Sequence, residues 1–117
     1  MPSLVIPAAV RAVTAAIATA RRCLTAAGLH AVGGPVIPPN PPGSTSPDGE
    51  VLVSAGPIPV FVAFYTDTGK ARRLEGEVTR NAARIGGQVE RRGAVTVLWT
   101  RPPGTKLRQT VEACAFA

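Results

Sequence analysis

The chain has 117 residues, a formal net charge of +6 at pH 7 and 45% hydrophobic residues, which is the size and composition of one small domain. Its single histidine, His30, has no cluster of cysteines or acidic residues near it in the sequence, so no zinc-binding pattern is present. We therefore expect no metal and no cofactor, and a basic protein that works by binding or assembly.

Residues 7–27 form the first expected element, an alanine-rich amphipathic helix. Pro7 suits the first helical position, because the amide that proline lacks would have no partner there. Gly28 is a typical residue at a helix end. The apolar residues that recur at helical spacing are Val10, Val13, Ile17 and Leu24.

The apolar segment 4–20 raises the question of a membrane. A transmembrane helix needs about 20 apolar residues with few charges, whereas Arg11 lies in the middle of this segment. A secretory signal needs a basic start, which Met1-Pro2-Ser3 does not supply. We expect a helix that packs against the core, with a membrane-surface helix or a helix docked on a partner as alternatives.

Residues 33–49 contain six prolines, and proline lacks the amide donor that a helix needs. The segment is expected to be an extended linker or an exposed arm. As an arm it would lie along a neighbouring subunit; the alternatives are a passive spacer and a ligand for an SH3-type domain. The candidate assembly residues of the arm are Pro35, Pro38, Pro39, Pro41 and Pro42.

Segments 51–54 and 58–65 are rich in valine, isoleucine and phenylalanine, and they are expected to be strands. Residues 67–69 are a turn signal. A helix is expected over residues 70–85, ending at Gly86-Gly87, although its glycines weaken it and a β-meander is the alternative. The helical face consists of Leu74, Val78, Ala82, Ile85 and Val89.

The C-terminal part is expected to be a β-hairpin. Residues 94–100 are the clearest strand, and residues 106–115 alternate well enough to predict a second strand that pairs with them. The sum is an α+β fold in three parts. These are an N-terminal helix (1–32), a proline- and glycine-rich arm (33–49) and a small, mostly antiparallel β unit with a second helix (50–117).

The two cysteines, Cys23 and Cys114, stand far apart in the sequence and form no Cys-x-x-Cys motif. This pattern indicates a reducing compartment or a redox-neutral role, with both cysteines as small buried hydrophobic residues. A disulfide between them is the alternative.

The hydrophobic fraction consists mainly of alanine and valine, which bury less apolar surface than large side chains do. We therefore expect a thin core that gains stability from partners or from copies of the chain. Trp99 is expected to belong to this core. The five aromatic residues are Phe61, Phe64, Tyr65, Trp99 and Phe116.

No catalytic pattern is visible. Gly69-Lys70 is typical of the end of a phosphate-binding loop, but the motif also needs a glycine where Phe64 stands and a serine or threonine where Ala71 stands. Glu75 and Glu77 are two residues apart, which directs them to different faces of a helix. We therefore expect no catalytic residues, no enzyme and no small-molecule substrate.

Between positions 70 and 108, ten basic residues stand against three acidic ones. A basic surface favours polyanions, although a solvated face that keeps the protein soluble is the alternative. No exposed aromatic residues alternate with these charges, so any DNA contact is expected to be nonspecific and to phosphates. The candidate polyanion-binding residues are Lys70, Arg72, Arg73, Arg80, Arg84, Arg91, Arg92, Arg101, Lys106 and Arg108.

One stretch resembles a known family. Residues 95–104, an apolar strand followed by a Pro/Gly turn, and residues 110–117 (Thr-Val-Glu-Ala-Cys-Ala-Phe-Ala) are similar to the N-terminal β-hairpin of actinobacteriophage head-to-tail stopper, or neck, proteins. Ala113 stands where that family has glycine, and in the family the hairpin opens a longer β domain. The resemblance covers about a fifth of the chain.

The resemblance implies a virion connector that assembles as a ring around the DNA channel, with the basic stretch facing DNA and the proline arm holding a neighbour. The expected partners are copies of the chain, neighbouring structural proteins and DNA phosphates, without a membrane. The expected location is the virion, assembled in the bacterial cytoplasm. The alternatives are a small nucleic-acid-binding or regulatory protein in the cytoplasm and a general protein-interaction module.

Overall fold

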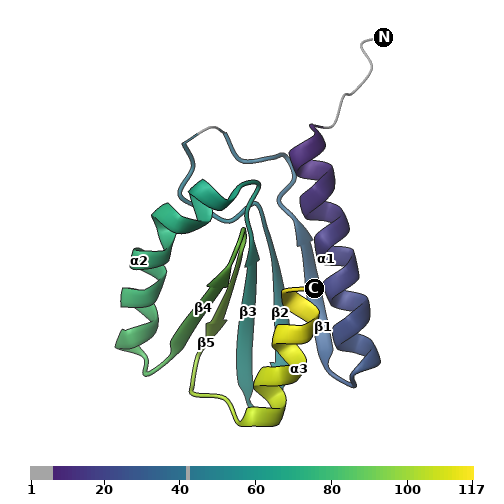
Figure 1. Ribbon diagram of the computed structural model, residues 1–117, viewed down its shortest axis with the longest axis vertical. Helices are drawn as coiled ribbons and strands as arrows, with labels where there is room; N and C mark the ends of the chain where they lie inside the picture. Colours follow the sequence, from purple (N-terminus) through teal and green to yellow (C-terminus); the bar gives the residue numbers. More distant parts are fainter. Residues whose placement is uncertain (1–6, 42) are drawn as a thin grey trace.

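The computed structural model describes residues 7–41 and 43–117. An antiparallel sheet of five strands forms the centre, in the spatial order β1-β2-β3-β5-β4, which bears out the α+β fold class (Figure 1). The strands are β1 (His30–Pro35), β2 (Gly49–Ala55), β3 (Ile58–Phe64), β4 (Gln88–Arg92) and β5 (Val95–Trp99). The helices are α1 (Ala8–Ala26), α2 (Thr68–Arg84) and α3 (Thr105–Ala115).

Helices α1 and α3 pack on one face of the sheet, which we call the covered face. Successive residues of a strand point to opposite faces, so one residue in two along each strand enters this core. Val51, Val62 and Val97 are paired across β2, β3 and β5, and all three are fully buried. Trp99 is buried beside them, as expected. The core contains mainly valine and alanine side chains, in agreement with the composition.

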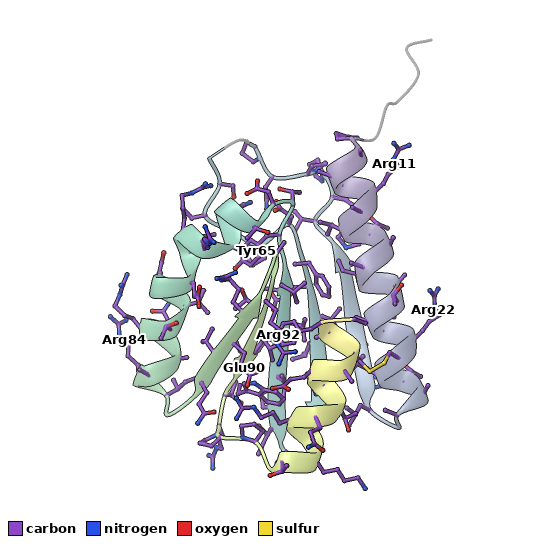
Figure 2. All side chains as sticks on the ribbon, viewed as in Figure 1. Arg11, Arg22, Tyr65, Arg84, Glu90 and Arg92 are labelled. Carbon is purple, nitrogen blue, oxygen red and sulfur yellow. A yellow bond between two sulfur atoms is a disulfide. The ribbon has the colours of Figure 1, made fainter. Side chains whose placement is uncertain are left out.

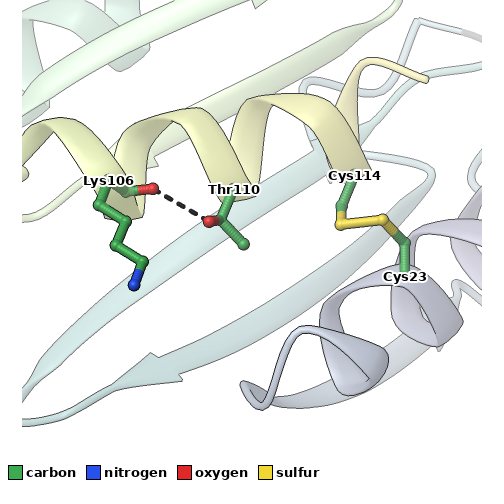
Figure 3. The surroundings of a disulfide bond; sticks show 4 residues. All are labelled: Cys23, Lys106, Thr110 and Cys114. Atoms are coloured by element: carbon green, nitrogen blue, oxygen red, sulfur yellow. Dashed lines mark hydrogen bonds between the residues drawn. A yellow bond between two sulfur atoms is a disulfide. The ribbon is translucent and has the colours of Figure 1, made fainter.

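A disulfide joins the two helices of the covered face. Cys23 of α1 and Cys114 of α3 are bonded, although 91 positions separate them in the sequence (Figure 3). The prediction of two unbonded cysteines is therefore wrong. The sequence contains no sign of this bond, because α1 and α3 become neighbours only when both pack on the same sheet.

Helix α2 packs on the opposite face, mainly over β4 and β5. Arg91 points to this face of β4, and its Nε donates to Oε2 of Glu75 in α2 at 2.6 Å. The helix begins where Asp67 accepts a hydrogen bond from the backbone amide of Lys70 at 2.7 Å, so residues 67–69 are a helix cap rather than a separate turn. The helix predicted over 70–85 is confirmed.

The structure corrects the C-terminal prediction. Residues 105–115 form α3, not a strand, and β5 pairs with β3 and β4 instead. Leu107, Val111 and Cys114 are spaced as on one face of a helix, and this spacing decides the structure because α3 thereby buries them on the sheet. The hairpin that carried the resemblance to neck proteins is not formed.

Two strands were not predicted. Residues 30–35 form β1 at one edge of the sheet, although they contain two glycines and a proline. Residues 88–92 form β4 at the other edge, although four of the five are polar. Edge strands tolerate charged residues and proline, because one side of each strand is unpaired in the sheet. Their composition therefore gave no strand signal.

The proline arm is shorter than predicted, because residues 33–35 belong to β1 and residue 49 to β2. Pro35 is thus a strand residue. Pro38, Pro39 and Pro41 lie in the connection between the two strands, where Asn40 donates to the carbonyl oxygen of Pro47 at 2.7 Å. Pro42 lies outside the described residues.

Of the predicted helical face of α2, Ile85 is 59% exposed and Val89 belongs to β4, so neither lies on the buried face of that helix. Other predictions of local structure agree with the fold. The helix expected over 7–27 is α1, and its apolar stripe faces the sheet. The strands expected over 51–54 and 58–65 are β2 and β3, which pair as a hairpin through a turn at residues 56–57. In that turn Gly56 has a φ of +65°, a conformation that favours glycine.

Candidate binding surface

Helix α2 covers only part of its face of the sheet, which we call the open face. The strand register aligns four apolar side chains of β1, β2, β3 and β5 across this face. Val32 is 42% exposed, and the other three are half-buried. We call this set the apolar row; it consists of Val32, Leu52, Phe61 and Leu98.

A groove of about 220 Å³ runs between the open face and α2. The small side chain of Ala63 lines the groove on the side of the sheet, and Val78 lines it on the side of α2. In the strand register, Glu50, Ala63 and Thr96 follow one another across β2, β3 and β5. The groove is lined by Pro47, Glu50, Phe61, Ala63, Tyr65, Val78, Thr96 and Leu98.

Glu50 is the charged residue that lines the groove, while Arg91, the register partner of Thr96, is paired with Glu75 of α2. Glu50 is exposed at the mouth of the groove and forms no ion pair with the residues that the structure describes, and partial burial of its carboxyl raises the pKa of Glu50. Burial also raises the pKa of Tyr65, and the negative charges of Glu50 and Asp48 raise it further. A cation near Glu50 and Tyr65 would therefore be stabilised.

Thr96 is the buried polar residue of the groove. It is 2% exposed, and its hydroxyl forms no hydrogen bond within residues 7–41 and 43–117. Buried hydroxyl groups in proteins nearly always have a partner, because leaving one unsatisfied costs about 1–3 kcal/mol. The Thr96 hydroxyl thus has unused hydrogen-bonding capacity beside the groove.

A second pocket, of about 340 Å³, lies between α1, the connection between β1 and β2, and the start of α2. Two of its charged groups, Asp48 and Lys70, are paired with each other, whereas Arg73 at its border forms no ion pair with the described part of the chain. Asp48 accepts from Nζ of Lys70 at 2.9 Å and from the backbone amide of Thr66 at 2.8 Å, while Asp67 caps α2. These contacts fix the connection to α2, so this pocket serves the fold.

A third polar cluster joins β4 to α3 on the covered side. Arg108 pairs with Glu90 and with Glu112, and Arg92 reaches Glu112 at 3.5 Å while lying over the ring of Phe116. Glu90 and Arg92 lie beside α3 in Figure 2. Burial raises the pKa of Glu90, and a hydrogen bond to Glu112 raises it further. These contacts attach α3 to the edge of the sheet.

The structure separates the ten candidate polyanion-binding residues into different surroundings. Lys70 is buried and paired with Asp48, Arg91 is paired with Glu75, and Arg92 and Arg108 belong to the cluster at α3. Two more, Arg101 and Lys106, are exposed near the start of α3. The exposed arginines of α2 are Arg72, Arg73, Arg80 and Arg84.

The four arginines of α2 form no ion pair with the described part of the chain. Arg84 points away from the sheet, as do Arg11 and Arg22 of α1 (Figure 2). Arg73 and Arg80 are about two helical turns apart, or roughly 11 Å along the axis. The basic stretch of the sequence thus consists of the exposed arginines of α2 and of several cationic side chains whose charges are neutralised by acidic partners.

Among residues 7–41 and 43–117, no group of three or more potential metal ligands lies together. His30 is exposed at the start of β1. Within the same residues, no helix has the length and hydropathy that crossing a bilayer requires.

The sequence predictions missed the residues of the groove. Glu50 and Thr96 are 46 positions apart, and only the pairing of β2, β3 and β5 brings them onto one face. The alternation of Leu52 with Val51 and Val53 gave a signal of a two-sided strand, but it does not say which face stays uncovered.

Comparisons of the chain with family models, with curated proteins and with solved structures find no match.

Proposed function

We propose that this protein is a binding module that holds a helix of another polypeptide against the open face. The observation that supports the proposal is the apolar row, which crosses four strands; α2 lies mainly over β4 and β5, so it leaves the end of the row on β1 and β2 uncovered. Side chains of this kind normally lie beneath a second layer of structure. A partner helix would supply that layer and remove the row from water.

The dimensions favour one helix as the occupant. Neighbouring strands lie about 4.8 Å apart, so β1, β2 and β3 span roughly 10 Å between the outer two axes. A helix with its side chains is about 10–12 Å wide. One helix therefore fits beside α2, and the unpaired Glu50 at the border favours a partner helix that carries a basic side chain.

The disulfide supports a location in an oxidising compartment. Structural disulfides persist in secreted and periplasmic proteins and are rare in the reducing cytoplasm. We therefore propose that the module meets its partner outside the reducing cytoplasm, which differs from the cytoplasmic assembly expected from the sequence. Alkylation of free thiols before and after reduction, on protein isolated from its native cells, tests the location.

Two variants of β2 test whether the apolar row is a surface kept for binding. We expect Leu52→Gln to lower the free energy of unfolding by no more than about 1 kcal/mol, because Leu52 lies on the open face. Val51→Gln, its neighbour on the covered face, is expected to cost about 3 kcal/mol or more. Urea denaturation measures both values, and similar losses for the two variants would argue against an open surface.

The same surface is expected to bind the apolar dye 8-anilinonaphthalene-1-sulfonate in the native state. Leu52→Gln and Phe61→Gln should each weaken the fluorescence increase, whereas Ile37→Gln should not, because Ile37 is 82% exposed but lies outside the apolar row. If the dye signal is absent or follows Ile37, the proposal fails. If sedimentation shows a dimer that Leu52→Gln dissociates, the occupant is a second copy instead.

A second candidate function, contact with nucleic acid, is favoured by the exposed arginines of α2. Each phosphate contact contributes about 0.9 to the slope of log K against log salt concentration. Replacing Arg72, Arg73, Arg80 and Arg84 by glutamine should therefore reduce that slope by roughly 3–4 for a DNA duplex. Fluorescence anisotropy at several salt concentrations measures it, with Arg11→Gln/Arg22→Gln as control; an unchanged slope removes this candidate.

The virion connector remains a prediction from the residues at 95–104 and 110–117. The proposed docking of a helix is compatible with a joint between structural proteins, whether the neighbour is a copy or another chain. Genes for portal, capsid or tail proteins beside the gene of this protein would support that assignment.

A further inference from the structure

The groove between α2 and the open face contains polar groups that the fold itself does not use. Thr96 is buried without a hydrogen-bond partner, and Glu50 forms no ion pair within the described residues. Both belong to one row of the strand register, with Ala63 between them. The two residues are two strand spacings apart, or about 10 Å between their Cα atoms.

The small side chain of Ala63 leaves the space between these two polar groups open. Phe61 and Leu98 of the apolar row border it on one side, and Val78 of α2 borders it on another. A ligand in the groove therefore meets apolar walls along its length and oxygen atoms where Glu50 and Thr96 stand. This pattern suits an alkyl chain that ends in a hydrogen-bond donor.

The charge of Glu50 determines that a cationic donor is preferred in the groove. The groove-lining carboxylate of Glu50 has no counter-ion from the described chain, whereas Asp48, near Tyr65, is paired with Lys70. An ammonium or guanidinium group supplies only donors, and carboxylate and hydroxyl oxygens accept them. An anionic or purely apolar group would leave Glu50 without a partner.

We propose that the groove takes the side chain of a lysine or arginine from the partner helix, with its alkyl stem along Phe61 and Leu98 and its charged end over Ala63, where it donates to Glu50 on one side and to Thr96 on the other. This inference rests on the proposed function, because the partner supplies the side chain. It adds a specificity element to an otherwise apolar contact, since a helix without a basic residue at this position leaves the buried Thr96 hydroxyl without a partner and the exposed Glu50 without a counter-ion.

A capped amino acid serves as the probe. Nα-acetyl-lysine N-methylamide is titrated into the ¹⁵N-labelled full chain, and Nα-acetyl-norleucine N-methylamide, which has the stem without the ammonium group, is the matched control. We expect saturable shifts of the backbone amides of Glu50, Ala63 and Thr96 with the lysine derivative alone. Equal shifts with the norleucine derivative would overturn the proposal.

Variants of the two polar groups complete the test. Glu50→Gln should weaken the binding of the lysine derivative about fivefold, the factor that a partly exposed ion pair contributes. Glu77→Gln, on the exposed side of α2, should leave the affinity unchanged. Thr96→Val should weaken binding without lowering the urea midpoint, since the free protein gains nothing from the hydroxyl; a large loss of stability would show that Thr96 serves the fold instead.

Acidification gives an independent readout. Because burial raises the pKa of Glu50, its carboxylate is neutralised at a higher pH than an ordinary glutamate, and the affinity should fall as pH decreases through that range. An affinity that does not depend on pH overturns the role of Glu50.

The outcomes separate this inference from the proposed function. Dye binding at the apolar row without binding of the lysine derivative would remove the basic anchor and keep the docking surface. If the lysine derivative binds saturably but Leu52→Gln destabilises the protein as much as Val51→Gln does, the basic anchor is kept and the docking surface is removed.

Discussion

Reduction of the disulfide is expected to lower the free energy of unfolding by about 4 kcal/mol. The bond between Cys23 and Cys114 closes a loop with a sequence separation of 91, and cross-links over loops of this length restrict the unfolded chain most strongly. Domains of this size have a total stability of about 5–15 kcal/mol, so the loss is a large share of it. Urea denaturation with and without dithiothreitol measures the effect.

A double variant controls for the reductant. Cys23→Ala/Cys114→Ala removes the bond, and its urea midpoint should match that of the reduced protein and stay constant when dithiothreitol is added. Both sites border the core, so each substitution also costs some packing. A wild-type midpoint that dithiothreitol does not move would contradict the structural role of the bond.

Asp48→Ala is expected to destabilise the protein by about 3–5 kcal/mol, the second large effect. Lys70 is 7% exposed, and its ammonium group donates to Oδ1 of Asp48 at 2.9 Å. Removing the carboxylate leaves a buried charge without its partner, which costs more than the pair contributes. The backbone amide of Thr66 loses its acceptor as well. Urea denaturation at pH 7 measures the loss.

Matched controls for Asp48→Ala lie in the same protein. Glu75→Ala breaks the pair with Arg91, in which the side chain of Glu75 is 39% exposed, and should cost no more than about 1 kcal/mol. Asp48→Ala/Lys70→Met removes both charges and should recover part of the stability. A cost for Asp48→Ala as small as that for Glu75→Ala would show that the pair is solvated.

The pH dependence of stability tests the same Asp48–Lys70 ion pair. Burial raises the pKa of Asp48, but the hydrogen bonds from Lys70 and Thr66 and the charge of Lys70 together hold this pKa below its usual value of 3.8. A lowered pKa in the folded state adds stability above the unfolded value, and that stability is lost as pH falls through the folded value. The difference between wild type and Asp48→Ala should therefore shrink below about pH 4.

The disulfide and the Asp48–Lys70 ion pair fix elements on the two sides of the sheet. The disulfide fixes α1 to α3 on the covered side, and Asp48 fixes the connection before β2 to the start of α2. Glu50 stands two residues after this anchored position. Reduced protein that keeps its dye binding would show that the open face does not depend on the covered side. We expect binding at the groove to weaken in Asp48→Ala, because α2 and β2 both border the groove.

The sequence by itself determined the elements whose signal is local. The apolar stripe of residues 8–26, the strands at 49–55 and 58–64 and the helix before Gly86 were all readable, because periodicity and turn residues act within a few positions. The burial of Trp99 followed from its place in an apolar strand. The valine-rich composition also indicated a core of small side chains.

Only the tertiary structure decided the rest. Residues 105–115 combine an alternating pattern with a helical one, and burial of Leu107, Val111 and Cys114 against the sheet selects the helix. The strands β1 and β4 form because β2 and β5 offer them free edges, whatever their own composition. The disulfide and the groove join residues far apart in the chain, and such neighbours exist only after the sheet has set its strand order.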